Sequence, residues 1–324
     1  MQDIQFYQEA FINQLKQLKL NRNPSTLYRP INYILDLGGK RLRPVLTLMS
    51  AEIFDCDYKK AFDAALCIEV FHNFTLMHDD IMDAAPLRRG KETVHLKWDL
   101  NTGILSGDAM LILAYQFLEN YDSQTFQKLT KLFTKTALEV CEGQQYDMDF
   151  ESCENVDIDD YLKMIAYKTA VLIGAAMKMG AIVANAHEEE QDKIYEFGKN
   201  LGIAFQLQDD YLDAFGNPET FGKQVGGDII ENKKTVLYIK AIENSTEEDK
   251  LELQQLFSIS PDDAHRKIVT AKDIFVSSGA AKATLEEIKK YTDKAFSVLE
   301  NMSIDSSKKV VLRQFGEKLM NRKA

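Results

Sequence analysis

Residues 74–83, FTLMHDDIMD, decide the fold, because a long apolar run ends in them on a DDxxD group of aspartates. Residues 205–213, FQLQDDYLD, repeat the arrangement. Both runs suit buried helices, and aspartates four residues apart lie on the same face of a helix. The two stretches therefore predict buried helices that each present carboxylates at one end.

Six carboxylates on apolar helices would repel one another, because low-dielectric surroundings strengthen the repulsion between like charges. A cation is needed between them, and an all-oxygen ligand set favours magnesium. A single DDxxD is usually a solvated helix face. Two copies near basic stretches favour a metal and phosphate site, with the candidate ligands Asp79, Asp80, Asp83, Asp209, Asp210 and Asp213.

Composition narrows the class of protein. The 324 residues are 45% hydrophobic and 27% charged, which is typical of a globular chain. Only 6 prolines and 16 glycines argue against many short strands. The net charge of −11 argues against a nucleic-acid surface. Nearly every periodic run is helical, so we expect a single all-α domain over residues 1–324 around a central cavity.

The cysteines and the amino terminus indicate the compartment. Cys56, Cys67, Cys141 and Cys153 have neither zinc-site nor disulfide-framework spacing. The first residues lack a basic patch followed by an apolar core, so no signal peptide is expected. No stretch reaches the roughly 18 apolar residues of a spanning helix. The sequence predicts a soluble, cytoplasmic protein without a membrane span.

Helical periodicity predicts the element boundaries. We expect helices over residues 3–20, 31–37, 44–54, 61–83, 104–120, 124–141, 161–184 and 190–215, and amphipathic helices within 234–324. Residues 151–160 are predicted to form a loop, with Asp159 or Asp160 capping the next helix.

Three basic segments lie near the acidic turns: GGKRLRP at 38–44, PLRRGK at 86–91 and GKQVGGD at 222–228. Each could be a surface loop, and the first a basic helix cap. In the first segment, glycines that let the backbone approach a ligand, beside arginines suited to bidentate phosphate contacts, favour an anion site. The third segment is either a lid over phosphates or a solvated loop. Taken alone, a histidine placed like His72 is more often a core or interface residue than a ligand-binding one. Lys168, taken alone, fits a lysine that snorkels to the surface as well as one that binds a ligand.

The combination of GGKRLRP, DDIMD, RRG, YKTA, FQLQDDYLD and GKQVGGD resembles the trans-isoprenyl diphosphate synthase family. The resemblance implies an isoprenoid synthase-type bundle of long antiparallel helices around a deep cavity, usually as a homodimer. It also implies two DDxxD turns that face each other and hold three magnesium ions, or manganese in their place, on the allylic diphosphate.

The resemblance assigns roles to particular residues. Asp79 and Asp83 would ligate two ions and Asp209 the third, with Asp80, Asp210 and Asp213 as further ligands or as their partners. The allylic diphosphate would contact Arg88, Lys168, Gln206, Lys223 and Lys233, with Thr169 facing the developing cation. Isopentenyl diphosphate would contact Lys40, Arg43, His72 and Arg89. Gln144 and Asp147 match a Q-x-x-D pair near the metals.

The implied reaction is ionisation of an allylic diphosphate of C5 to C15, attack by the double bond of isopentenyl diphosphate, and proton loss to the released pyrophosphate. An aromatic residue at the position of Phe74 accompanies short products in the family, and Thr75 is not a second aromatic. Geranylgeranyl diphosphate is the favoured product and farnesyl diphosphate the next. Alternatively, Phe74 is a core residue and another helix sets the length.

Two other functions share features of this sequence. A class I terpene cyclase also ionises a diphosphate over DDxxD, but its second metal motif usually differs and it needs no second diphosphate site. A non-catalytic subunit of a heteromeric synthase typically lacks aspartates of the acidic turns. Here all six aspartates are present, which favours the synthase.

Overall fold

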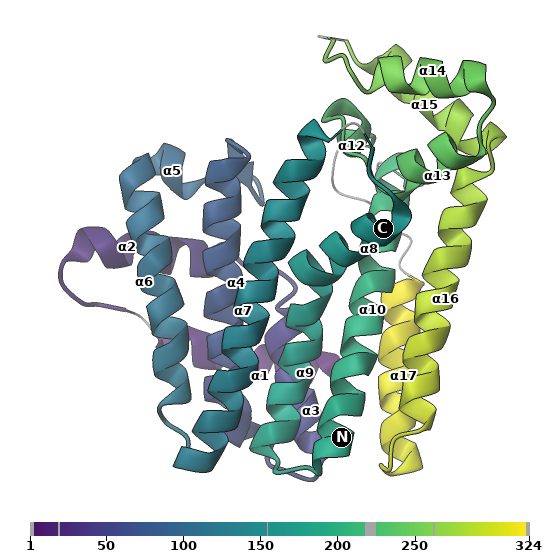
Figure 1. Ribbon diagram of the computed structural model, residues 1–324. Helices are drawn as coiled ribbons and strands as arrows, with labels where there is room; N and C mark the ends of the chain where they lie inside the picture. The colour runs from purple at the N-terminus through teal and green to yellow at the C-terminus, as the bar shows by residue number, and fades with distance from the viewer. Residues whose placement is uncertain (1–2, 19, 154, 218–224, 262, 322–324) are drawn as a thin grey trace. The chain divides into compact units, whose positions relative to one another are not determined.

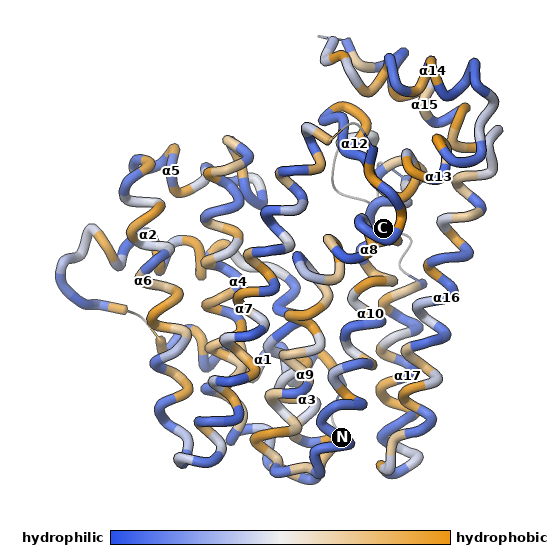
Figure 2. The backbone as a smooth tube through the Cα atoms, in the orientation of Figure 1, coloured by the Kyte–Doolittle hydropathy of each residue, from blue (hydrophilic) through white to orange (hydrophobic). Residues whose placement is uncertain are grey.

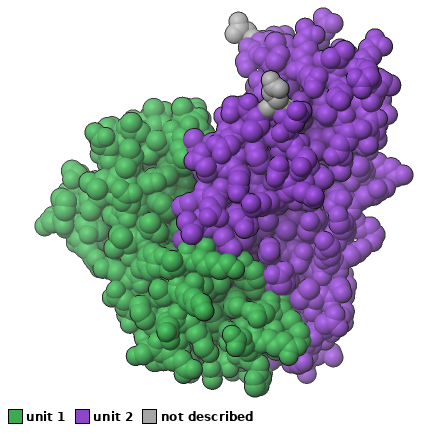
Figure 3. Space-filling view, in the orientation of Figure 1, with its two compact units in different colours: residues 1–135, 175–195 green, residues 136–174, 196–324 purple. Residues whose placement is uncertain are grey.

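The computed structural model describes residues 3–18, 20–153, 155–217, 225–261 and 263–321. Within these residues the chain consists of helices, loops and one very short hairpin (Figure 1), which confirms the all-α prediction. The chain divides into two compact units, residues 1–135 with 175–195 and residues 136–174 with 196–324 (Figure 3). The single domain over residues 1–324 stays a prediction.

Unit 1 is built around a buried helix. Its elements are α1 (Ile4–Gln17), α2 (Ser25–Asp36), α3 (Leu42–Ile53), η1 (Tyr58–Ala61), α4 (Phe62–Met82), β1 (Leu87–Arg88), β2 (Lys91–Glu92), α5 (Val94–Lys97) and α6 (Leu100–Leu118). Helix α4 packs against α6 and α3 and is buried along most of its length. A Cβ atom at Gly107 of α6 would lie 2.1 Å from Nε2 of His78. Glycine therefore sets the close approach of α6 to the acidic end of α4.

The predicted basic loop after α4 contains a tight hairpin. Leu87 pairs with Glu92 and Arg88 with Lys91 in antiparallel register. The two turn residues, Arg89 and Gly90, have φ angles of 54° and 73°, as a type I′ turn requires. The hydroxyl of Tyr33 in α2 donates a 2.8 Å hydrogen bond to the carbonyl of Glu92. The hairpin is thereby tied to α2.

Unit 2 contains the second acidic helix. Its elements include the later parts of α7 (Ser123–Ser152) and α10 (Glu188–Phe215), with α8 (Ile158–Ile165), the π-helical turn η2 (Ala166–Ala170), α12 (Gly227–Ile230), α13 (Val236–Asn244), α14 (Glu247–Leu256), α15 (His265–Ser277), α16 (Ala280–Glu300) and α17 (Ser306–Met320). Helix α9 (Val171–Val183) begins in unit 2 and ends in unit 1. Polar and apolar residues alternate along α16 and α17 (Figure 2), and α16 packs its apolar face on α13 and α15.

Several predicted boundaries were wrong. Helix α2 begins at Ser25, not at residue 31, because Pro30 lies inside the helix; a proline there removes one hydrogen bond without ending the helix. Helix α7 continues to Ser152, since Glu, Gln and Asp tolerate solvent-facing helical positions. The cap of α8 is Asp157, whose carboxylate accepts a hydrogen bond from the amide of Asp160; Asp159 and Asp160 lie in the first turn.

Among the described residues, one helical segment, Ile158–Val183, is long and apolar enough to cross a membrane, and an 18-residue window of it has a mean hydropathy of 1.3. The protein buries 78% of that window. Its apolar composition is therefore that of a core helix.

Candidate active site

The first acidic turn lies at the carboxyl end of α4. Asp79 and Asp80 occupy its last turn, and Asp83 is the C-cap, with its amide 2.9 Å from the carbonyl of Asp79. That bond keeps the helical geometry through residue 83, so Asp79 and Asp83 are one helical turn apart. The predicted pairing of these two carboxylates along one helix agrees with this backbone.

Asp80 has a different environment from Asp79. Its side chain is buried, and Nε of Arg88 lies 2.8 Å from both of its carboxylate oxygens. Nη2 of Arg88 is 2.6 Å from Oδ1 of Asp80 and 3.8 Å from Oδ2 of Asp79. Burial raises the pKa of Asp80, and the arginine opposes the shift. The hairpin arginine is thereby held beside the acidic turn.

The GGKRLRP segment brings its backbone close to the same hairpin. Gly38 and Gly39 have φ angles of 83° and 120°, which favour glycine. A Cβ atom at Gly39 would lie 2.7 Å from the guanidinium of Arg89, and Arg89 donates a hydrogen bond to the carbonyl of Gly38. Lys40 is exposed. The GGKRLRP segment and the hairpin therefore lie against each other in unit 1, and the binding roles of Lys40 and Arg89 stay a prediction.

Arg43 and His72 meet directly. Nη1 of Arg43 lies 3.2 Å from Nε2 of His72, and a guanidinium only donates, so Nε2 accepts and Nδ1 carries the histidine proton. The buried Nε of Arg43 has no hydrogen-bond partner among the described residues. Burial lowers the pKa of Arg43 to about 10, where it is still protonated at neutral pH. An orphaned charged donor is suited to an anionic ligand.

The His72 environment predicts a pH dependence of stability. Burial, together with four arginines led by Arg43, lowers its pKa well below the ordinary value. On acidification the unfolded chain takes up a proton at this residue that the folded chain does not. We expect the free energy of unfolding to fall by about 1 kcal/mol more in the wild type than in His72→Asn between about pH 7.5 and 5.5.

Denaturant titrations at the two pH values measure this difference. His265→Asn is the matched control, because His265 is exposed on α15. Equal pH sensitivity of the wild type and His72→Asn would mean that folding does not lower the pKa of His72.

Phe74 and Thr75 lie on α4 just before the acidic turn. The Phe74 ring is 5.6 Å from that of Phe71 and 4.8 Å from the His78 ring. Only 8% of its surface is exposed, so it is mainly packed. The hydroxyl of Thr75 donates to the carbonyl of His72 at 2.8 Å. Their role in product length stays a prediction.

The second acidic turn, in unit 2, is held by a chain of hydrogen bonds. Thr169 donates to Oε1 of Gln206 at 3.2 Å, and Nε2 of Gln206 donates to Oδ1 of Asp210 at 2.9 Å. The hydroxyl of Tyr161 donates to Oδ2 of Asp210. These contacts orient the Gln206 amide and place Thr169 and Gln206 beside the acidic turn. The aspartate that accepts both bonds is therefore held in one orientation.

The loop after α10 is fastened to the last aspartate of the turn. The amide of Asp228 donates to Oδ2 of Asp213 at 3.0 Å, and the amide of Gly226 donates to the carbonyl of Asp213 at 2.7 Å. Burial and neighbouring carboxylates raise the pKa of both Asp210 and Asp228. A bound cation would relieve this repulsion, so these residues fit a metal ion.

Lys168 is presented by a distortion of its helix. Residues Ala166–Ala170 form a π-helical turn, a feature frequently found at functional sites. A Cβ atom at Gly143 of α7 would lie 2.2 Å from the backbone nitrogen of Lys168, so only glycine permits this contact. Nζ of Lys168 is 2.5 Å from Oδ2 of Asp147. Gln144, predicted to pair with Asp147, has a buried Nε2 without a hydrogen-bond partner in the described chain.

These side chains of unit 2 line an open pocket of about 130 Å³. Among its lining residues are Asp147, Lys168, Thr169, Gln206, Asp210 and Lys233. Lys233 pairs with Glu231 at 2.9 Å. Lys223 falls outside the described residues. The pocket collects cations and carboxylates, as a site for a diphosphate and a metal requires.

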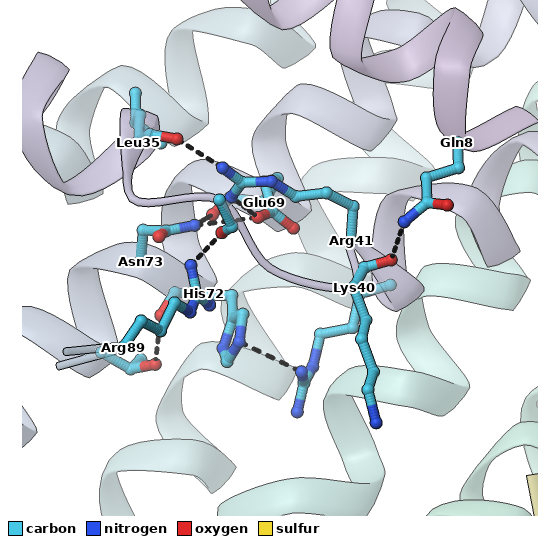
Figure 4. A network of polar contacts seen from close by, with 11 residues as sticks. Gln8, Leu35, Lys40, Arg41, Glu69, His72, Asn73 and Arg89 are labelled. Atoms are coloured by element: carbon cyan, nitrogen blue, oxygen red, sulfur yellow. Dashed lines mark hydrogen bonds and ion pairs between the residues drawn. The ribbon is translucent and has the colours of Figure 1, made fainter. Parts of the chain in front are cut away.

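Sequence reasoning gave no role to three site residues. Tyr161 carries no local signal, and only the fold shows that it reaches Asp210. Asp228 belongs to a quoted motif, and its position after the glycines was the available clue. Arg41 was grouped with the basic segment, but its guanidinium pairs with Glu69 inside unit 1 (Figure 4).

Among the described residues, no three His, Cys, Asp or Glu side chains come together as a complete metal site. Magnesium usually keeps waters and substrate phosphate oxygens in its shell and takes only one or two protein carboxylates. The aspartates of each acidic turn, taken separately, are therefore oxygen donors of the kind that this ion takes.

Known proteins resemble the chain along most of its length. The polyprenyl synthetase family model matches residues 24–274. A short chain isoprenyl diphosphate synthase from Methanothermobacter thermautotrophicus is 36% identical, covering 85% of this chain and 84% of the relative. A geranylfarnesyl diphosphate synthase from Natronomonas pharaonis is 38% identical over 75% of each chain.

A solved structure gives a closer match. The crystal structure of a geranylgeranyl pyrophosphate synthase has a TM-score of 0.96 and 55% identity, covering 100% of both chains. A family match over residues 24–274, together with the likeness in sequence and fold, shows that the chain belongs to the polyprenyl synthetase family.

Proposed function

We propose that the protein is a geranylgeranyl diphosphate synthase, which condenses isopentenyl diphosphate with an allylic diphosphate and releases pyrophosphate. Prenyl transfer as the class of reaction follows from the family. The C20 product is supported by the solved relative that is 55% identical. The geranylfarnesyl relative makes a longer product the next candidate, ahead of farnesyl diphosphate.

The allylic diphosphate is proposed to bind to cations beside the acidic turns. Asp79, Asp83 and Asp209 would hold magnesium, or manganese in its place, with Asp80, Asp210 and Asp213 as ligands or as partners of ligands. The bound metal would supply positive charge that makes pyrophosphate a better leaving group. Arg88, Lys168 and Lys233 add positive charge from the protein, and Lys223 extends this set outside the described residues.

Uncharged groups of unit 2 are proposed to face the reacting carbon. Thr169 uses its hydroxyl proton to donate to Gln206, so the lone pairs of its oxygen are available to a developing cation. Gln206 in turn orients Asp210. Thr169 and Gln206 would position the reacting groups and would not transfer a proton. The proton lost during formation of the product would pass to pyrophosphate.

Isopentenyl diphosphate is proposed to bind Lys40, Arg43, His72 and Arg89. The observation that carries the proposal is the orphaned, buried Nε of Arg43 beside a neutral His72. A terpene cyclase needs no second diphosphate site, so this cationic cluster favours the synthase. All six aspartates of the acidic turns are present, which favours a catalytic chain over a non-catalytic subunit.

We also propose a homodimer in the cytoplasm. Helix α6 exposes four large apolar side chains, namely Leu100, Ile104, Leu105 and Ile112, whose exposed fractions are 51%, 42%, 61% and 60%. Exposed apolar side chains along one helix are typical of an interaction face, and the family usually forms homodimers. Light scattering of the wild type measures the assembly, and a monomeric mass would contradict this proposal.

Product analysis tests the function. The purified protein would be incubated with magnesium, labelled isopentenyl diphosphate and, separately, C5, C10 and C15 allylic diphosphates. We expect a C20 product, and we expect EDTA to abolish it. Pyrophosphate release without incorporation of label would indicate a cyclase. Absence of turnover with every primer would indicate a non-catalytic subunit.

Phe74→Ala is expected to lengthen the main product by at least one C5 unit, because it removes the ring that we propose as the floor under the allylic chain. Chromatography of the dephosphorylated products measures the length. Phe133→Ala is the matched control, since Phe133 is a buried ring of unit 1 that packs on Phe71. An unchanged product from Phe74→Ala would mean that another residue sets the length.

A further inference from the structure

Arg41 lies between two proposed ligands of isopentenyl diphosphate, but its side chain takes another direction. Figure 4 shows it running toward Glu69 and Leu35, while the side chain of Lys40 points the opposite way. Arg41 is 6% exposed and Glu69 is 2% exposed. The sequence makes Arg41 look like a third cation for a phosphate. Its burial shows that it is not available to one.

The guanidinium of Arg41 joins two elements of unit 1. It donates to the carboxylate of Glu69 in the middle of α4 and to the carbonyl of Leu35 near the end of α2. Carbonyls in the last turn of a helix have no partner within the helix. A planar guanidinium can satisfy this carbonyl and the carboxylate together, whereas an ammonium is a point donor. The arginine therefore links α2, α4 and its own loop.

Glu69 is itself held in place. Nδ2 of Asn73, one turn further along α4, donates to Oε1 of Glu69 at 3.0 Å and to the backbone carbonyl of Glu69 at 2.8 Å. The carboxylate therefore presents a fixed acceptor to Arg41. A buried ion pair often contributes little net stability, and it can instead specify one conformation.

The backbone of the loop needs such a constraint. Arg41 has a φ angle of 48° at the N-cap of α3, and no side chain caps that end. It follows Gly38 and Gly39, whose φ angles are also positive. A left-handed arginine is uncommon and persists when surrounding contacts determine it. The buried ion pair supplies those contacts.

The loop in turn places the other cations. Lys40 precedes Arg41, and Arg43 follows it at the start of α3, within reach of His72. The carbonyl of Gly38 accepts a hydrogen bond from Arg89. With the charge of Arg41 balanced by Glu69, the surplus positive charge of this loop belongs to Lys40, Arg43 and Arg89. Their placement depends on where the backbone of residues 38–43 lies.

We propose that Arg41 is a positioning residue whose buried ion pair with Glu69 holds residues 38–43 in the conformation that binds the diphosphate of isopentenyl diphosphate. Arg41 itself does not contact the substrate. The inference rests on the proposed function. Of the three cations in the KRLR segment, Lys40 and Arg43 would bind the substrate, and Arg41 would hold the loop through its ion pair with Glu69.

The test uses the double variant Arg41→Met/Glu69→Met. Removing one partner alone would leave a buried unpaired charge, whereas replacing both with apolar side chains is often tolerated. We expect this variant to fold. Its Kd and KM for isopentenyl diphosphate should rise about tenfold or more, because Lys40 and Arg43 are no longer held in the conformation that binds the diphosphate. Its KM for the allylic substrate should stay within about twofold of the wild type.

Calorimetric titration with isopentenyl diphosphate alone measures Kd, and circular dichroism measures folding. Lys178→Met/Asp192→Asn is the matched control, because it removes another ion pair of unit 1, located between α9 and α10. If the double variant at residues 41 and 69 does not fold, Arg41→Lys replaces it under the same criteria, because an ammonium keeps the charge pair with Glu69 but lacks the planar guanidinium that also reaches the carbonyl of Leu35.

A folded variant that binds isopentenyl diphosphate as tightly as the wild type would overturn the proposal. So would equal losses for both substrates, which would indicate general support of the fold. Failure of the proposed function is a separate result: the wild type itself would not extend an allylic diphosphate.

Discussion

Asp79→Ala is expected to lower kcat for chain extension by about a thousandfold, because removing a preorganised charge at a reacting centre costs a factor of this order. Asp79 is the first aspartate of the acidic turn on α4, one helical turn before Asp83. Its loss would weaken the proposed magnesium site and leave the departing pyrophosphate with less positive charge beside it. The arginine contact with Asp80 would remain.

The same variant is expected to keep its fold. The charge of Asp79 raises the pKa of Asp80, so its removal relieves repulsion rather than creating an unpaired buried group. The melting temperature should therefore stay within about 1.5 °C of the wild type, which corresponds to about 1 kcal/mol for a chain of this length. This separates a catalytic loss from unfolding.

Steady-state kinetics over a range of magnesium concentrations measure the effect. Asp273→Ala is the matched control, because Asp273 is exposed on α15. A near-normal rate for Asp79→Ala at limiting magnesium would contradict the assignment of this aspartate to the metal.

Gly143→Ala should have the second large effect, through the position of Lys168. The added Cβ atom would lie 2.2 Å from the backbone nitrogen and 2.7 Å from Cα of Lys168. These are backbone atoms, so a helix must shift. Overpacking of this kind costs about 3 kcal/mol, which exceeds the roughly 1 kcal/mol that alanine gains over glycine in a helix.

The displaced turn carries both Lys168 and Thr169. A misplacement of about 1 Å in a positioning group can cost about a hundredfold in rate. We therefore expect Gly143→Ala to lower kcat about a hundredfold per folded molecule, and to lower the free energy of unfolding. Denaturant titration and kinetics normalised to the folded fraction measure the two effects separately.

Gly180→Ala provides a steric control. Its Cβ atom would lie 2.2 Å from the backbone carbonyl oxygen of Thr47 in unit 1, away from Lys168. It should lower stability in the same way without the loss of kcat. Equal losses of kcat in both variants would show that packing strain in general, rather than the position of Lys168, limits turnover.

The sequence by itself determined the helical class and supplied most of the candidate site residues. Helical periodicity can be recognised in a single sequence, because an amphipathic helix places apolar residues at regular intervals. The DDxxD turns, the GGKRLRP segment and the YKTA segment are local strings whose residue types state their chemistry. Asp79 and Arg88 could therefore be proposed from the residues themselves, and Lys168 from the family resemblance, before any contact was known.

Boundaries were less predictable where a local signal competes with packing. Pro30 suggested a helix start, but it lies inside α2 and is buried. The polar residues after Cys141 suggested a helix end, yet α7 continues to Ser152, and Gly143 within it lies against the backbone of Lys168. In both cases the decisive partner is distant in sequence.

Only the tertiary structure showed which side chains of the same charge form buried ion pairs or hydrogen bonds and which do not. Arg41 and Arg43 are two residues apart in one basic segment. Arg41 forms a buried ion pair with Glu69, whereas the Nε of Arg43 has no hydrogen-bond partner among the described residues. Asp210 is held by Tyr161, which lies 49 residues earlier. Burial and hydrogen bonding depend on neighbours that folding brings together, and these set the energy of each charge.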